Sequence, residues 1–323
     1  MIDIKLDDYQ PPFWLFNGHL QTIVPSQFRS VRDLTYTREI ITTPDDDFLL
    51  LDWAGKLSDK LVVISHGLEG DSYRPYIKGM ARAFVKKGYQ ALAWNFRGCG
   101  GQINKNLRFY HSGATDDLDF VVNYAISQNS YKKIVLVGFS LGGNLTLKFL
   151  GEHSNNLDQI IASAITFSVP VDLHSSSNKI GQRSNLIYSQ RFIRNLKKKI
   201  AHKMPSMPHK LTLDHFDKIK TLKDFDEHYT APIHGFTDAE DYYKKCSSLY
   251  FLEDIKVPTL IVNAKNDPFL ADECYPYAAT EHHPFVKLCT PSQGGHVGFM
   301  PRGVSSEGNY WSEDQAVHFA QNH

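Results

Sequence analysis

The fold is decided by one stretch of the sequence, Lys133-Ile134-Val135-Leu136-Val137-Gly138-Phe139-Ser140-Leu141-Gly142-Gly143-Asn144-Leu145. It begins as an apolar, β-branched run, passes through the pattern Gly-x-Ser-x-Gly and continues with helical spacing. A strand that turns sharply into a helix needs residues without side chains beside the turn, and the glycines meet that need. The stretch therefore predicts a strand, a nucleophile elbow with Ser140 at its tip, and a helix. A phosphate-binding loop is disfavoured, because neither GxxxxGK[ST] nor GxGxxG occurs.

On both sides of this stretch, short apolar runs alternate with amphipathic segments, which is the pattern of parallel strands covered by helices. Apolar residues at helical spacing recur from Ile77 to Phe84 and from Leu118 to Ala125. We therefore predict an α/β fold with a mainly parallel central sheet and helices on both of its faces. The predicted strands are Leu61 to Ser65, Gln90 to Asn95, Lys133 to Gly138, Ile160 to Phe167, Thr259 to Asn263 and Val286 to Thr290.

Two segments depart from this alternation. Arg38 to Thr42 and Phe48 to Trp53 flank a Pro-Asp turn and predict an antiparallel hairpin at the edge of the sheet. The interval from about Pro170 to Val257 is rich in Lys, His and Asp and contains helical pieces such as Tyr188 to His202. Because the strand pattern resumes afterwards, we interpret residues 170–257 as a helical cap inserted after the sixth strand. A single domain over residues 1–323 is more economical than a boundary at Pro170.

Composition narrows the class of protein. The chain has 323 residues, of which 42% are hydrophobic and 22% charged, as in soluble globular proteins. Its formal net charge of 0 gives no basic field, so we expect no nucleic acid partner. The four cysteines form no CxxC pair or zinc-spaced cluster, and we expect no metal and no cofactor.

No apolar run approaches the roughly 18 residues of a membrane span, and Met1 to Gln10 lack the apolar core of a signal peptide. We expect a cytoplasmic protein with no stable membrane anchor.

A serine hydroxyl becomes a good nucleophile only beside a general base that an acid orients. With a nucleophile elbow, the expected chain order is serine, acid and then histidine. Asp267 follows the predicted strand at Thr259, and His296 lies between glycines after the next strand. Both lie where side chains reach the carboxyl edge of the sheet. The sequence therefore predicts a catalytic triad of Ser140, Asp267 and His296.

Other carboxylates compete with Asp267 for this role. Asp172 also follows a predicted strand, but it does not directly precede the histidine strand, so we favour Asp267. Asp116 and Asp117 follow Thr115 at a predicted helix start, where they complement the helix dipole. We interpret these two as structural.

Acyl transfer places negative charge on the substrate's carbonyl oxygen, and backbone N–H groups aimed at that oxygen stabilise it. Leu141 follows the nucleophile directly and provides one such group. We predict that Leu68, in the His66 to Gly70 loop after the first parallel strand, provides the other. His66 is a rival base, but packing of the loop is its favoured role under the triad order.

Together these residues resemble the α/β-hydrolase superfamily, and further segments are similar to its YheT branch, which is related to embryogenesis-associated proteins of plants. The resemblance spans nearly the whole chain. It implies an α/β-hydrolase fold, carboxylic ester hydrolysis and a triad at Ser140, Asp267 and His296. The segments that carry it are Asn17 to Ile23, His66 to Gly70, Asn95 to Cys99, Tyr110 to Gly113, Thr230 to Phe236, Asn266 to Phe269 and Gly295 to Phe299.

The predicted function is a serine esterase that works through an acyl-enzyme on small-molecule esters, either short-chain or acylglycerol-like. A non-catalytic binding protein with the same pocket is an alternative, because fold alone does not define activity. An acyltransferase or thioesterase with the same triad is another. Dehalogenases and epoxide hydrolases are disfavoured, because their usual elbow nucleophile is a carboxylate.

Two features of the predicted cap have competing interpretations. Its aromatic side chains either line an acyl pocket or pack the cap, and packing is favoured. The run Lys197-Lys198-Lys199 either touches anionic lipid or forms a solvated helix face, and the solvated face is favoured. The aromatic residues are Phe192, Phe216, Phe225, Tyr242, Tyr243 and Phe251.

Overall fold

A computed structural model describes residues 8–207, 209–303 and 308–323. Its centre is an eight-stranded sheet with the order β1-β2-β4-β3-β5-β6-β7-β8. The hairpin β1–β2 and the pair β2–β4 are antiparallel, and every later pair is parallel. The predicted edge hairpin and mainly parallel sheet are therefore confirmed. The strands are β1 (Thr37–Thr42), β2 (Phe48–Ala54), β3 (Lys60–Ser65), β4 (Gln90–Asn95), β5 (Lys133–Phe139), β6 (Ile161–Phe167), β7 (Thr259–Val262) and β8 (Val286–Cys289).

The central strands are apolar on both sides, because each side faces its own hydrophobic cluster. Val63 and Leu136 belong to one cluster, whereas Val62 and Val137, their neighbours in sequence, belong to the other. Successive side chains of a strand point to opposite faces, so a strand covered on both faces is a continuous apolar run.

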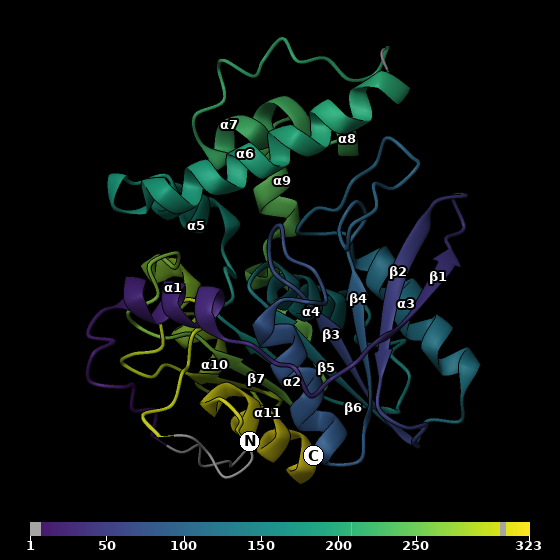
Figure 1. The fold of residues 1–323 in the computed structure, drawn as a ribbon, viewed down its shortest axis with the longest axis vertical. Helices are drawn as coiled ribbons and strands as arrows, with labels where there is room; N and C mark the ends of the chain where they lie inside the picture. The colour runs from purple at the N-terminus through teal and green to yellow at the C-terminus, as the bar shows by residue number, and fades with distance from the viewer. Residues whose placement is uncertain (1–7, 208, 304–307) are drawn as a thin grey trace.

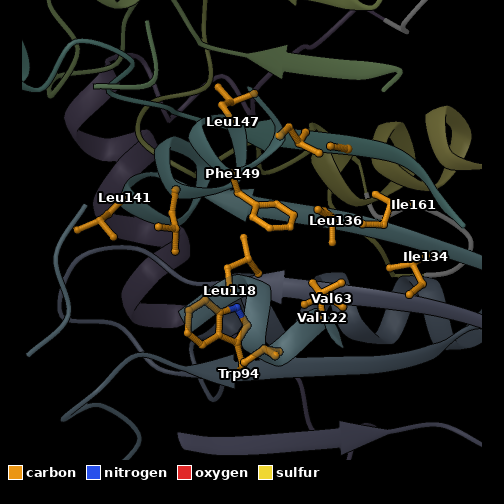
Figure 2. Packing of buried hydrophobic residues seen from close by; sticks show 14 of the residues in the cluster. Val63, Trp94, Leu118, Val122, Ile134, Leu136, Leu141, Leu147, Phe149 and Ile161 are labelled. Atoms are coloured by element: carbon orange, nitrogen blue, oxygen red, sulfur yellow. The ribbon is translucent and has the colours of Figure 1, made fainter. Parts of the chain in front are cut away.

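Two pairs of helices cover the two faces of the sheet (Figure 1). The helices α3 (Thr115–Gln128) and α4 (Leu141–Glu152) pack on the face of Val63, and Figure 2 shows Leu118 and Phe149 in the same apolar layer. The helices α2 (Pro75–Lys86) and α11 (Trp311–Asn322) pack on the opposite face, through side chains such as Phe84 and Phe319. Helices on both faces are thus confirmed.

Between β6 and β7 the chain leaves the sheet and is mostly helical, as predicted for a cap after the sixth strand, with a non-helical stretch between η2 and α7. Figure 1 shows α5, α6, α7 and α8 gathered at one end of the molecule, above the sheet. The elements of this cap are α5 (Leu173–Ile180), η1 (Arg183–Asn185), α6 (Leu186–Lys203), η2 (Met204–Ser206), α7 (Leu222–Phe225), the π-helical turn η3 (Asp226–Thr230), α8 (Ala231–His234), α9 (Ala239–Cys246) and η4 (Ser248–Asp254).

Outside the cap, the described residues also form the helices α1 (Gly18–Phe28), η5 (Asp272–Cys274) and α10 (Tyr277–Thr280). In the part of the chain that the structure describes, no helix combines the length and apolar character needed to cross a membrane. Nor do the described residues hold three or more His, Cys, Asp or Glu side chains close enough together to bind a metal ion.

Candidate active site

Ser140 is the single residue between the last residue of β5 and the first residue of α4. Its backbone has φ 53° and ψ −121°, a strained conformation for a residue with a side chain. The neighbouring glycines make room for this turn. A Cβ on Gly142 would lie 2.4 Å from the His66 carbonyl oxygen, and one on Gly138 would lie 2.5 Å from the Gly142 carbonyl oxygen. The Gly-x-Ser-x-Gly pattern therefore forms a tight elbow because only glycine fits beside the serine.

The three predicted triad residues meet in one hydrogen-bonded series. His296 Nε2 lies 3.0 Å from Ser140 Oγ, and His296 Nδ1 lies 2.9 Å from Asp267 Oδ2. Asp267 is 4% exposed, and its Oδ1 also accepts the Phe269 N–H at 2.9 Å. Phe269 packs on the His296 ring with the centroids 4.3 Å apart. The imidazole is thus held at a fixed angle between the hydroxyl and the carboxylate.

The rival carboxylates have structural contacts. Asp172 caps α5, with Oδ1 accepting the Ser175 N–H at 2.7 Å. Asp117 pairs with the buried Arg97 at 2.8 Å, and Asp116 hydrogen-bonds to Arg108. The carboxylate that contacts His296 is therefore Asp267, whereas the other three aspartates cap a helix or pair with arginine.

The two predicted oxyanion donors line the same cavity as Ser140 and His296. Leu141 is the first residue of α4, so its N–H has no acceptor within the helix. Leu68 lies in the loop after β3, where the Gly67 N–H donates to the Tyr76 hydroxyl at 3.1 Å and the Gly70 N–H donates to the Gly67 carbonyl at 3.0 Å. These bonds fix the loop on both sides of Leu68.

His66 supports the loop that carries Leu68. Its Nε2 accepts the Phe96 N–H at 3.2 Å, which leaves Nδ1 to donate to the Gly67 carbonyl at 2.8 Å. Complete burial lowers the pKa of His66 to about 3, so the ring is neutral. With both ring nitrogens engaged by backbone groups, His66 packs the loop as predicted.

Glu69, next to Leu68, ties this loop to the cap. It has a positive φ of 54°, and its Oε1 lies 2.7 Å from the Nζ of Lys199 on α6. The Tyr110 hydroxyl donates to the same oxygen at 2.7 Å. A solvated face for the whole Lys197 to Lys199 run is therefore wrong: Lys197 donates to the Phe216 carbonyl, Lys199 is paired, and only Lys198 is exposed. The helical repeat turns Lys199 inward, where the buried Glu69 offsets its charge.

The N-terminal helix α1 holds the loops that carry the acid and the base. Gln21 Oε1 accepts from Asn266 Nδ2 at 3.0 Å and from the Gly294 N–H at 2.8 Å. The His296 N–H donates to Thr22 Oγ1 at 2.8 Å. Local sequence patterns predict no role for Gln21 or Thr22. The Asn17 to Ile23 segment, which supported the family resemblance, was the available signal.

A cavity lies between the cap and the carboxyl edge of the sheet, and Ser140 opens into it. Much of its lining is apolar and comes from both the core and the cap. Of the six cap aromatics, Phe225, Tyr242 and Tyr243 line this cavity, Phe192 and Phe216 pack in the hydrophobic cluster of the cap, and Phe251 lies against Lys148 of α4. Both interpretations of the cap aromatics therefore hold, for different residues. Other apolar lining residues are Phe109, Leu196, Ile200, Leu222 and Ile233.

The fold and the elbow define the class of this protein: the chain belongs to the alpha/beta hydrolase fold family, whose model matches residues 60–302. Within that family it belongs to the YheT branch. It is 33% identical to "Putative esterase YheT" of Escherichia coli (strain K12), over 88% of this chain and 84% of that protein. It is 26% identical to the embryogenesis-associated protein EMB8 of Picea glauca, over 94% of this chain and 70% of that protein.

A third relative, 30% identical over 80% of this chain and 58% of its own length, is named a monoacylglycerol lipase of Saccharomyces cerevisiae. Among solved structures, the Pyrococcus furiosus esterase Pf2001 matches with a TM-score of 0.60 and 19% identity, over 99% of both chains. At that identity the likeness concerns the fold. The proteins named here as esterases or as a lipase belong to the class of carboxylic ester hydrolases, the class that the sequence predicts.

Proposed function

We propose that this protein is a serine-dependent carboxylic ester hydrolase that works through an acyl-enzyme. The observation that carries the proposal is the series of hydrogen bonds from Asp267 through His296 to Ser140, which ends in an apolar cavity. A protein that only binds a ligand does not need a strained serine beside an oriented histidine.

In the proposed reaction, His296 Nε2 takes the proton of Ser140 as Oγ attacks the ester carbonyl carbon. The tetrahedral intermediate collapses when His296 returns the proton to the leaving alcohol. Water, deprotonated by the same nitrogen, then releases the acid from the acyl-enzyme. Asp267 keeps Nδ1 protonated and stabilises the imidazolium without taking the proton itself.

The N–H groups of Leu68 and Leu141 hold the oxyanion in both steps. Removal of one such donor typically lowers kcat by about 10²–10³. Since both are backbone groups, their positions depend on the Gly67 to Gly70 loop and on the first turn of α4. Residues 170–257 act in this proposal as a cap over the serine within a single domain, and exclude water from the apolar lining.

The substrates that fit this cavity are esters with apolar acyl chains, either short-chain or acylglycerol-like, since the lining offers mainly hydrophobic contacts. Transfer of the acyl group to an alcohol is a second candidate activity. A relative 28% identical over 80% of this chain is named a medium-chain fatty acid ethyl ester synthase/esterase 2 of Saccharomyces cerevisiae. Product analysis in water with and without added ethanol separates the two activities.

The direct test is the intact mass of the protein after exposure to a fluorophosphonate probe, followed by peptide mapping. We expect one adduct on Ser140 that is absent in Ser140→Ala and strongly reduced in His296→Ala. A panel of esters graded by chain length then measures turnover. Folded protein that gains no adduct and cleaves no ester would overturn the proposal in favour of a binding protein.

A further inference from the structure

The cavity has a polar group on its cap side that the proposed chemistry does not use. Asp226 is the first residue of the π-helical turn η3, and it lines the cavity together with Thr230, Tyr243 and Ser177. Single π-helical turns are rare and occur often at functional sites. Asp226 is half-buried, and it is one of the residues that line the cavity.

The carboxylate of Asp226 has two donors and free acceptor positions. Thr230 Oγ1 donates to Oδ1 at 2.6 Å, and the Tyr243 hydroxyl donates to Oδ2 at 2.7 Å. Ser177 Oγ supports the tyrosine at 2.9 Å. A carboxylate has about four lone-pair sites, so these two bonds leave acceptor capacity on both oxygens.

The surroundings of Asp226 are neutral. Among the ion pairs of the described residues, none includes Asp226. Burial raises its pKa to about 6, against the hydrogen bonds from Thr230 and Tyr243. Two histidines on the cap side of the cavity lining, His111 and His234, are neutral as well, because burial lowers the pKa of both.

A carboxylate with unused acceptor positions at the wall of a mainly hydrophobic cavity calls for a donor from the ligand. A hydroxyl group meets this need, because the carboxylate accepts its hydrogen bond and its desolvation costs far less than that of an ion. An ammonium group would lose several kcal/mol of hydration, which a carboxylate already bonded to two donors offsets poorly. The hydroxyl is therefore the favoured partner.

We propose that Asp226 is a specificity-determining residue that binds a hydroxyl group on the part of the substrate that contacts the cap. The substrate class is then an ester that carries a hydroxyl group in addition to its ester bond. This inference rests on the proposed ester hydrolase function. The hydroxyl belongs either to the acyl chain or to the alcohol portion, and separate substrates distinguish these two sources.

The first experiment compares kcat/KM for matched pairs of esters. One series has p-nitrophenyl esters of ω-hydroxyacyl and plain acyl chains of four to ten carbons, and the other has octanoate esters of diols and of simple alcohols. We expect a preference of about tenfold or more for the hydroxylated member of one series, carried mainly by KM. In Asp226→Asn this preference falls below about threefold. The matched control is Asp224→Asn, a carboxylate in the capping box of α7 and outside the cavity lining.

The outcomes separate a specificity role from a structural one. Loss of the hydroxyl preference in Asp226→Asn but not in Asp224→Asn, with fluorophosphonate labelling of Ser140 kept in both variants, supports the proposal. Equal loss of kcat/KM for both members of a pair, or a wild-type protein that prefers neither series, overturns it.

A binding measurement keeps the inference distinct from the proposed function. Isothermal titration of Ser140→Ala protein compares 8-hydroxyoctan-2-one with octan-2-one, ketones that no esterase cleaves. We expect about tenfold tighter binding of the hydroxyketone, lost when Asp226→Asn is added. If wild-type protein hydrolyses no ester but this difference holds, the ester hydrolase proposal fails and the hydroxyl site stands. If esters are hydrolysed and the ketones bind equally, the hydroxyl site fails.

Discussion

Replacement of Lys199 by methionine tests whether the cap positions an oxyanion donor. Lys199 Nζ lies 2.7 Å from Glu69 Oε1, and the two side chains are only 16% and 6% exposed. Lys199→Met keeps the apolar stem and leaves Glu69 buried with Tyr110 as its remaining partner. Removal of one partner of a buried ion pair costs about 3–5 kcal/mol of stability, and the bond from Tyr110 favours the lower end.

The effect on turnover follows from the chain connection between Glu69 and Leu68. If the pair holds the loop, its loss moves the Leu68 N–H, and complete loss of one donor would lower kcat by about 10²–10³. We expect a smaller fall, about tenfold or more in kcat, with KM changed by less than about threefold. Steady-state kinetics on one ester and urea unfolding measure the two effects separately.

Two variants make this prediction decisive. Lys198→Met changes the exposed neighbour on the same helix and should leave kcat and stability unchanged. Lys199→Met combined with Glu69→Gln removes the unpaired charge and should recover part of the stability, but not the full kcat. A Lys199→Met protein that is destabilised yet keeps wild-type kcat would refute the reasoning, because the pair would then hold the cap without positioning Leu68.

Three further predictions follow from other contacts. Gly142→Ala should lower the free energy of unfolding by about 1–3 kcal/mol or more, because the added Cβ would lie 2.4 Å from the His66 carbonyl oxygen. Gly303→Ala, whose Cβ would meet nothing within 4 Å, should leave the free energy of unfolding unchanged in the same urea titration. Asp267→Asn should lower kcat by about 10⁴-fold. Asp172→Asn keeps an oxygen that can cap α5, so its kcat should stay within about tenfold of wild type. Equal losses of kcat in the two variants would exclude Asp267 as the acid of the triad. The pKa of His66 is about 3 in the folded protein and higher in the unfolded chain, so the free energy of unfolding should fall as pH drops below about 6.5, by up to about 1.36 kcal/mol per pH unit. His66→Asn should flatten this slope. An unchanged slope would contradict a neutral, buried His66.

The sheet was predictable because its information is local. Continuous apolar, β-branched runs mark strands that are buried on both faces, and the predicted strand Gln90 to Asn95 coincides with β4. The Ser140 elbow was predictable for a similar reason, since strand, turn and helix follow one another without interruption. Strand ends were less certain: the run ending at Thr290 stops at Cys289 in the structure, because the end of a ladder depends on the partner strand.

The contacts around the candidate site were less accessible to sequence reasoning. Lys199 and Glu69 lie 130 residues apart. No local pattern shows that Lys199 on α6 contacts the loop that carries Leu68. The same holds for Asp226, whose position toward the cavity depends on a π-helical turn that helical periodicity does not predict. Buried polar partners are chosen by tertiary packing, so a charged side chain in a polar segment is easily assigned to solvent.

The contacts of α1 with the acid and base loops bear on the order in which the protein assembles. Gln21 and Asn266 are 245 residues apart in the chain, and Thr22 and His296 are 274 apart. Contacts between such distant segments close the largest loops of the chain and form slowly. During synthesis Ser140 emerges long before His296, and the donors that Gln21 Oε1 and Thr22 Oγ1 accept from are among the last residues to be made. Under the proposed mechanism, the nascent chain therefore holds the Ser140 nucleophile without its general base until His296 has been made, and hydrolysis begins only with nearly the whole polypeptide.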